Sequence, residues 1–262
     1  MRRVLQTLML AGLLHTGCLH IALAQGELPQ ELIQIGLSTD TIAITSGFAG
    51  ADLTIFGAVT NTDPQVQRLG RYDIIVVLEG PETPMVVREK TRMFGMWLNT
   101  RSADFDVVPL SYIASSTRKM RDITDNGSFK KLSLGIENLL LDTGRAKTQI
   151  AGEFADALKD INRKSGRYSE DSGLVEFISP NLFRATLRLP TNVPIGKHKA
   201  RAFLFRNGAF IKESSAGLQI EKAGVEQNVY RFAHEHSFIY GLLAIALAMI
   251  TGWLGRVIFR KD

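Results

Sequence analysis

The sequence has almost no cysteine: Cys18 is the only one among 262 residues. A single cysteine cannot form a disulfide within the chain, and it excludes cysteine-rich zinc folds and iron–sulfur clusters held by one chain. Histidine is scarce too, and no Gly-x-Ser-x-Gly, Gly-x-Gly-x-x-Gly or P-loop motif occurs. We therefore expect a protein that is not an enzyme and carries no cofactor or metal.

The N-terminus has the pattern of a secretory signal peptide. Two arginines follow Met1, and an uncharged, apolar stretch then covers residues 4–24. It closes on Ala22-Leu23-Ala24, a small-x-small cleavage sequence. We expect cleavage after Ala24, so that residues 1–24 are removed, and an uncleaved N-terminal helix is the alternative.

A second uncharged stretch of 19 residues runs from Ser237 to Gly255. As a helix it spans about 28 Å, close to the ~30 Å hydrocarbon core of a bilayer. Tyr240 and Trp253 stand near its ends, where amphipathic rings prefer the membrane interface. Basic residues follow at once in the tail 256–262, and basic tails stay in the cytoplasm. We expect a single-pass protein of the bacterial inner membrane, with the bulk of the chain in the periplasm and a cytoplasmic C-terminus.

The formal net charge of +5 lies mainly in these two ends. Of the 31 basic residues, two belong to the signal peptide and three to the tail, while one of the 26 acidic residues lies in the tail. The part between them carries 26 basic and 25 acidic residues and is nearly neutral. This balance lacks the excess of positive charge that nucleic-acid binding requires, so we expect no nucleic-acid partner.

Residues 25–121 have the pattern of a β-rich domain. Residues 72–78 are apolar on both faces, as a central strand would be, and residues 93–98 are interpreted as another strand. Strand-like runs recur about every ten residues with turns between them. This spacing suggests an antiparallel sandwich of immunoglobulin-like size.

The period changes over residues 122–166, where two stripes of apolar residues follow helical spacing. We interpret them as a helical hairpin inserted in the β-rich chain. Strand patterns return over residues 167–222, and this second β-rich region is either another small sandwich or the other half of the first. Residues 223–236 form a juxtamembrane segment that leads into the membrane helix.

Several short motifs produce a family resemblance. They are Leu37-Ser38-Thr39-Asp40, the segment from Ile44 to Leu53, Val76-Val77-Leu78-Glu79-Gly80-Pro81, and a terminal helix from Tyr240-Gly241 to Gly252-Trp253. With these motifs the chain resembles the "putative transmembrane protein" family of alphaproteobacteria over nearly its whole mature length. The resemblance implies a periplasmic domain with a C-terminal anchor. The family has no established activity, so the resemblance assigns no functional residues. It also implies an accessory role, because members are often encoded beside sulfite-exporter-type permeases.

Two basic stripes with a period of two residues are the candidate ligand-binding residues. They are Arg88, Lys90 and Arg92 in the first β-rich region, and Lys197, Lys199 and Arg201 in the second. On a strand each set would project from one face, where it could bind an anionic solute, a lipid headgroup or an acidic partner. A solvated outer face of a sandwich is the alternative. His198 is expected in a solvated turn.

Small residues recur at spacings of three or four along the expected membrane helix, where they would allow close helix–helix packing. They are Gly241, Ala244, Ala248 and Gly252. Our first hypothesis is a non-enzymatic, membrane-anchored periplasmic interaction module, accessory to a membrane transporter or envelope complex. Its partners would be the lipid bilayer and an integral-membrane protein such as a sulfite-exporter-type permease. The second hypothesis is an anion-binding or sensing domain that uses one basic stripe.

Overall fold

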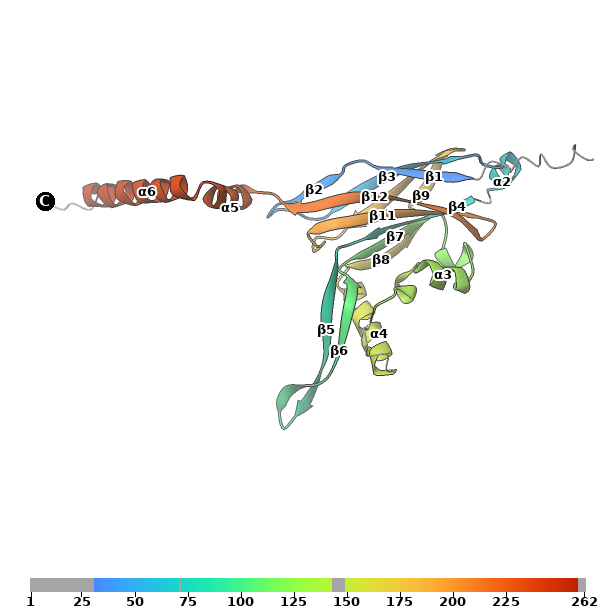
Figure 1. The fold of residues 1–262 in the computed structure, drawn as a ribbon, viewed down its shortest axis with the longest axis horizontal. Coiled ribbons are helices and arrows are strands. Elements are labelled where there is room, and N and C mark those ends of the chain that lie inside the picture. Colours follow the sequence, from blue (N-terminus) through green and yellow to red (C-terminus); the bar gives the residue numbers. More distant parts are fainter. Residues whose placement is uncertain (1–30, 71, 143–148, 259–262) are drawn as a thin grey trace, which may run out of the picture. The chain divides into compact units, whose positions relative to one another are not determined.

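The computed structural model describes residues 31–70, 72–142 and 149–258. The predicted signal peptide and the end of the predicted cytoplasmic tail lie outside these residues. The described chain is mostly β, with several antiparallel strand pairs and one long apolar helix near the C-terminus, which confirms the predicted fold class. Figure 1 gives the element labels used below.

One four-stranded sheet is antiparallel throughout. Its strands, in spatial order, are β1 (Leu32–Leu37), β3 (Ala51–Thr60), β10 (Leu182–Leu189) and β9 (Val175–Ser179). Alternate residues of β3 are buried, beginning with Leu53 and Ile55 and ending with Val59. This alternation is the pattern of a strand with one face on a core.

A six-stranded sheet faces the first one. Its strands, in spatial order, are β2 (Thr41–Ile44), β12 (Ala209–Lys222), β11 (Gly196–Arg206), β4 (Tyr72–Glu79), β7 (Tyr112–Ser116) and β8 (Tyr168–Ser172). The central pairs are antiparallel, and the two outermost pairs, β2 with β12 and β7 with β8, are parallel. Residues 72–78 of β4 are all buried, as the sequence predicts for a central strand.

The two β-rich regions of the chain build a single sandwich. β10, from the second region, pairs with β3 from the first, and β11 pairs in the same way with β4. The main core lies between the sheets, where Ile55 and Phe183 from one sheet share a cluster with Val76 and Leu204 from the other. Of the two arrangements that the sequence allows, the strand pairing therefore selects the one in which the second region completes the first.

The segment between the two regions does not form the predicted helical hairpin. α3 (Asn126–Leu132) and the short 3₁₀ helix η2 (Ile136–Asn138) pack Phe129 and Ile136 against the outer face of the six-stranded sheet. α4 (Gln149–Lys164) instead packs Phe154 and Leu158 against a different strand, β6 (Met96–Pro109). The two apolar stripes thus pack against different parts of the β structure and not mainly against each other, which helical spacing alone cannot reveal.

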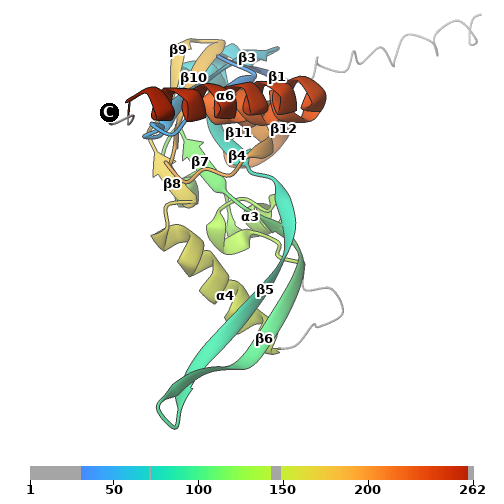
Figure 2. The same cartoon turned by 90° about the vertical axis from the view of Figure 1, so that its left-hand side faces the viewer.

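That strand belongs to a long hairpin, β5 (Glu82–Met93) and β6 (Met96–Pro109), which forms a two-stranded sheet of its own. We call it the arm. α4 packs against the arm, and Figures 1 and 2 show that the arm continues past the end of the helix. The interpretation of residues 93–98 as one strand was wrong, because the chain reverses at Phe94 and Gly95.

The C-terminal part consists of α5 (Val225–Glu235) and α6 (Ser237–Ile258). Residues Ser237–Arg256 are long and apolar enough to cross a membrane, with a mean hydropathy of 1.9, and none of this span is buried inside the described structure. A helix with apolar residues on every side needs an apolar surrounding. α6 is therefore the candidate membrane helix that the sequence predicts.

Candidate functional site

The end of the arm is a two-residue turn with an unusual residue in it. Phe94 and Gly95 have φ values of +49° and +81°, and Met93 pairs with Met96 across the turn. Two positive φ angles in a two-residue hairpin loop are those of a type I′ turn, which favours Asn-Gly or Gly-Gly. Gly95 suits its position, whereas Phe94 carries a bulky side chain in a conformation that L-residues disfavour.

Apolar side chains around this turn lie in solvent. Phe94 is 96% exposed and Trp97 is 67% exposed. We call the whole group the hairpin tip; its members are Met93, Phe94, Met96, Trp97 and Leu98, all of them exposed. Isolated exposed apolar residues are ordinary on protein surfaces, but a contiguous group of them marks a contact surface.

α4 packs against the part of the arm nearer the sandwich. Ala103 and Phe105 of β6 are buried against Phe154 of α4. Arg101 closes this contact region, with ion pairs to Glu89 at 2.5 Å and to Glu153 of α4 at 3.3 Å. The guanidinium also lies 5.7 Å from the centre of the Phe154 ring. The covered part of the arm therefore ends at Arg101, and the hairpin tip extends beyond it.

The first predicted stripe lies along the arm, next to the hairpin tip. Arg88, Lys90 and Arg92 are exposed and alternate with residues of the α4-facing side, so they occupy the other face of β5. No described acidic residue pairs with any of the three. Arg92 lies directly opposite Trp97 in the strand register. Residues 88–101 contain four basic residues and one acidic residue, a net charge of +3.

The three residues of the second predicted stripe do not share one environment, because two are exposed to solvent and one forms salt bridges. Lys197 and Lys199 are exposed on β11. Arg201 instead forms ion pairs at 3.0 Å with both Glu79 and Glu213, and its guanidinium lies 4.7 Å from the centre of a phenylalanine ring. Two carboxylates already neutralise Arg201, so the set does not act as three available cations.

His198 is not the solvated turn residue that the sequence suggested. It lies within β11 and is only 2% exposed, because its side chain turns toward the core between Lys197 and Lys199. Its Nε2 is 3.4 Å from Oγ of Ser111, and its Nδ1 is 3.2 Å from the carbonyl oxygen of Gly196. Burial lowers the pKa of His198, which favours the neutral ring.

This serine–histidine pair lacks the surroundings of a hydrolase centre. Ser111 is 1% exposed, so a substrate carbonyl cannot reach its hydroxyl while the strands remain paired. The Nδ1 atom of His198 faces a backbone carbonyl and not a carboxylate. We therefore interpret the contact as a satisfied pair of buried polar groups.

An open cleft lies at one end of the sandwich. It has a volume of about 880 Å³ and is bounded by the short helix α2 (Pro64–Arg68), by Val59 and by Val175 and Phe177 of β9. α2 is fixed to the β9–β10 turn by the Gln67 side-chain amide, which donates to Pro180 and Asn181. The cleft is therefore a preformed feature of the fold.

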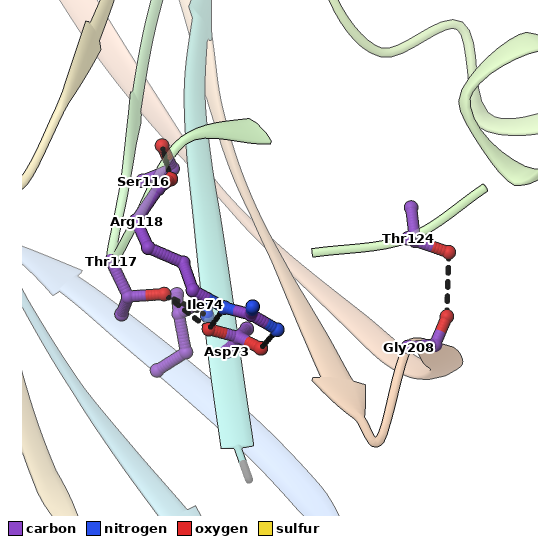
Figure 3. A network of polar contacts seen from close by, with 7 residues as sticks. All are labelled: Asp73, Ile74, Ser116, Thr117, Arg118, Thr124 and Gly208. Carbon is purple, nitrogen blue, oxygen red and sulfur yellow. Dashed lines mark hydrogen bonds and ion pairs between the residues drawn. The ribbon is translucent and has the colours of Figure 1, made fainter. Parts of the chain in front are cut away.

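One wall of the cleft carries a polar network, which Figure 3 shows. Arg118 donates two hydrogen bonds to the buried carboxylate of Asp73, from Nε at 2.9 Å and from Nη2 at 2.7 Å. Thr117 donates a third to Asp73 at 2.9 Å and accepts one from the backbone of Ile74 at 3.3 Å. These hydrogen bonds with Asp73 raise the pKa of Arg118. The network ties the start of β4 to the segment after β7, which is a structural role.

Within residues 31–70, 72–142 and 149–258, no group of three or more His, Cys, Asp or Glu side chains is placed to hold a metal ion. The four small residues of the predicted packing set, Gly241, Ala244, Ala248 and Gly252, all lie on α6. Their spacing places them along one side of that helix. A Cβ atom added at Gly241 or Gly252 meets nothing within 4 Å in the described structure.

Comparison with known protein families gives a match that covers nearly all of the described chain. A family model described as "Putative transmembrane protein (Alph_Pro_TM)" matches residues 32–261. The chain belongs to this family. The match covers the sandwich, the arm and the candidate membrane helix together, so the β domain and the apolar helix are parts of one family architecture. A comparison with curated proteins finds no match.

Sequence reasoning missed the hairpin tip. The signal that could have revealed it is Phe94-Gly95, an X-Gly pair flanked on both sides by residues that favour strands. Its first residue is Phe and not Asn or Asp, so the turn did not resemble the usual hairpin sequence.

Proposed function

We propose that this protein is a non-enzymatic, membrane-anchored interaction module, accessory to a membrane transporter or envelope complex. In this proposal α6 anchors the chain in the inner membrane, the sandwich works in the periplasm and the C-terminal tail is cytoplasmic. The integral-membrane partner would be a protein of the sulfite-exporter permease type or another component of the envelope. The arm is the working surface.

The observation that carries the proposal is the exposed apolar end of a braced arm. α4 and Arg101 contact the part of the arm nearer the sandwich. The hairpin tip lies at the far end of the arm, where no described residue covers it. An arm with such an end adds nothing to the sandwich core, and it exposes apolar surface to water. Such an arrangement is suited to contact with another molecule. The sealed Ser111–His198 pair supports a module without hydrolase activity.

The test is purification of the full chain from bacterial membranes in a mild detergent, followed by mass spectrometry. We expect a defined integral-membrane protein to co-purify with the wild type, and its recovery to fall when Arg88, Lys90 and Arg92 are all changed to Gln. The matched control is Lys197→Gln with Lys199→Gln, which removes exposed charge from the sandwich instead. A monomeric protein without any integral-membrane partner would contradict the proposal.

Anion binding by a basic strand face is the second candidate. The observation in its favour is that the basic stripe of the arm is exposed and has no acidic partner among the described residues. The stripe on β11 supports it less, because two glutamates neutralise Arg201. Isothermal titration of the full chain with sulfite, sulfate and phosphate tests this candidate. Heat released by the wild type but not by the triple Gln variant would support it.

A further inference from the structure

Two properties of Phe94 give no benefit to the stability of the folded chain. Its backbone has a φ of +49°, which Asn or Gly would adopt at less cost, and the residue is 96% exposed, so that the described part of the chain leaves it almost uncovered. Neither stability nor solubility explains a phenylalanine at this position. Backbone strain that persists at an exposed residue points to a role outside the fold.

We propose that the hairpin tip inserts into the surface of a lipid bilayer, while the basic stripe of the arm binds anionic headgroups. Phe94 and Trp97 enter the boundary between headgroups and acyl chains, and Arg88, Lys90 and Arg92 contact lipid phosphates. The inference rests on the proposed function, in which the arm is the working surface, and it names what the end of the arm contacts. The domain is then oriented at the membrane by a second contact besides α6.

The arrangement of apolar and basic residues along the arm fits the layers of a bilayer surface. Adjacent members of the basic stripe are two residues apart, or about 7 Å along a strand. Arg92 is likewise two residues before Phe94 at the apex of the turn. Apolar side chains of interfacial segments enter to a depth of about 5–10 Å, so an inserted Phe94 leaves Arg92 at the level of the headgroups. Lys and Arg side chains near an anionic surface are attracted to it.

The apolar residues occupy both faces of the ribbon, and this favours a bilayer over a flat protein surface. In the strand register Met93 and Met96 form a directly opposed pair, and Leu98 lies two residues further along the same face. Trp97 lies on the other face, opposite Arg92, and Phe94 lies between the faces at the apex. A flat protein surface contacts one face of a ribbon, whereas lipid surrounds a ribbon that inserts into it. Trp is also a residue that prefers the membrane interface.

The family and the candidate membrane helix place a bilayer next to this protein in the proposed function. The chain belongs to a transmembrane family and has a candidate membrane helix. A tether converts the second contact into an intramolecular one, so that a weak contact is still well populated. The small apolar area of the hairpin tip is therefore sufficient for a reversible contact with the same membrane.

The sequence provides a direct probe, because it contains only two tryptophans, Trp97 and Trp253. Trp253→Phe leaves Trp97 as the sole tryptophan of the full chain, and Trp97→Phe leaves only the one in α6 as a reference for the anchor. Each variant is placed in lipid nanodiscs of phosphatidylcholine alone or of phosphatidylcholine with phosphatidylglycerol. Quenching by lipids brominated on the acyl chain reports insertion, and quenching by acrylamide reports contact with water.

We expect lipid bromine to quench Trp97 in the nanodiscs that contain phosphatidylglycerol, with less quenching in phosphatidylcholine alone. Phe94→Asn should weaken insertion of the tip at least about tenfold, since a buried aromatic side chain is lost. The triple Gln variant of the basic stripe should remove the effect of phosphatidylglycerol. Lys197→Gln with Lys199→Gln is the matched control and should leave Trp97 quenching unchanged.

Two results would overturn the inference. One is a Trp97 that acrylamide quenches fully while lipid bromine quenches only the tryptophan of α6. The other is a Trp97 shielded from both quenchers, which would mean that protein covers the tip. These outcomes are independent of the co-purification experiment, so a protein partner without tip insertion would sink the lipid inference and leave the proposed function intact.

Discussion

Replacing Phe94 by Asn should stabilise the arm, although most substitutions destabilise a protein. The residue has a φ of +49° in a type I′ turn, and Asn is among the residues best suited to that position. The Phe94 ring is 96% exposed, so its removal takes away almost no packing within the chain. The substitution therefore relieves backbone strain without creating a cavity.

The size of the effect follows from the backbone alone. A left-handed conformation costs an L-residue roughly 1–2 kcal/mol, and Asn avoids part of this cost through local hydrogen bonding of its short side chain. We expect a gain of about 1 kcal/mol, which corresponds to roughly a fivefold change in the equilibrium between the closed and the opened arm. The gain belongs to the arm and not to the sandwich, because the arm forms a separate two-stranded sheet.

Hydrogen exchange measured by mass spectrometry is the appropriate assay, since it reports local opening. Backbone amides of residues 88–101 should exchange about fivefold more slowly in Phe94→Asn than in Phe94→Ala. Both variants lack the ring, so any contact of the ring with detergent cancels in the comparison. Ala retains the disfavoured backbone conformation and isolates the contribution of strain. Equal exchange in the two variants, or faster exchange in the Asn variant, would refute the reasoning.

Three further predictions concern the sandwich. Gly57→Ala should destabilise it by about 3 kcal/mol in urea unfolding, because the added Cβ would overlap the buried Phe183 ring and lie 2.8 Å from a backbone oxygen. Arg118→Gln should cost about 2 kcal/mol in the same assay, since the buried carboxylate of Asp73 loses both hydrogen bonds from the guanidinium and keeps the one from Thr117. The free energy of unfolding should fall as the pH falls below about 6.5, because burial lowers the pKa of His198 and the unfolded chain then binds the proton more tightly. Stability from this group is complete above that pH, and the slope is at most about 1.4 kcal/mol per pH unit.

Each of these predictions has a control within the chain. Gly36→Ala adds a Cβ with nothing within 4 Å, so it should change stability by less than about 0.5 kcal/mol. Adding Asp73→Asn to Arg118→Gln should restore part of the loss, because it removes the unpaired charge. His198→Gln should lack the acid-dependent part of the stability curve. A mild Gly57→Ala variant, no recovery on adding Asp73→Asn, or a pH profile unaffected by His198→Gln would contradict the respective argument.

The sandwich could be predicted from the sequence because its strands obey simple periodicities. Alternation along β3 and the continuous burial of residues 72–78 reflect one-sided and two-sided cores. The same rules cannot say whether two β-rich regions share a core. That depends on pairings between residues more than one hundred positions apart, such as Ala185 with Ile55. Helical spacing likewise identifies an apolar stripe but not its partner, and the partner of Phe154 is the arm.

Burial of His198 and exposure of the tip escaped prediction for opposite reasons. Lys197 and Lys199 flank the histidine, and their charge suggested a turn, but the pleat of β11 points alternate residues to opposite faces. At the tip, the apolar run of residues 93–98 was interpreted as one strand, and nothing in it indicated that its side chains are exposed, because apolar residues usually lie inside. A segment selected for contact with another molecule has the same composition as a core strand. Only the structure distinguishes them, through an absence of covering residues around the tip within the described part of the chain.

The strain at Phe94 separates the two explanations for an exposed apolar tip. A tip that is merely tolerated would be free to acquire Asn at the turn, since Asn both fits the backbone and removes an aggregation-prone ring. A tip that binds needs a ring at the apex and accepts the backbone strain of about 1–2 kcal/mol. The lipid contact of an inserted aromatic side chain, at about 1.5–3 kcal/mol, is large enough to offset that strain. Phe94→Asn should therefore move stability and membrane contact in opposite directions, which neither a structural role nor a neutral surface position would produce.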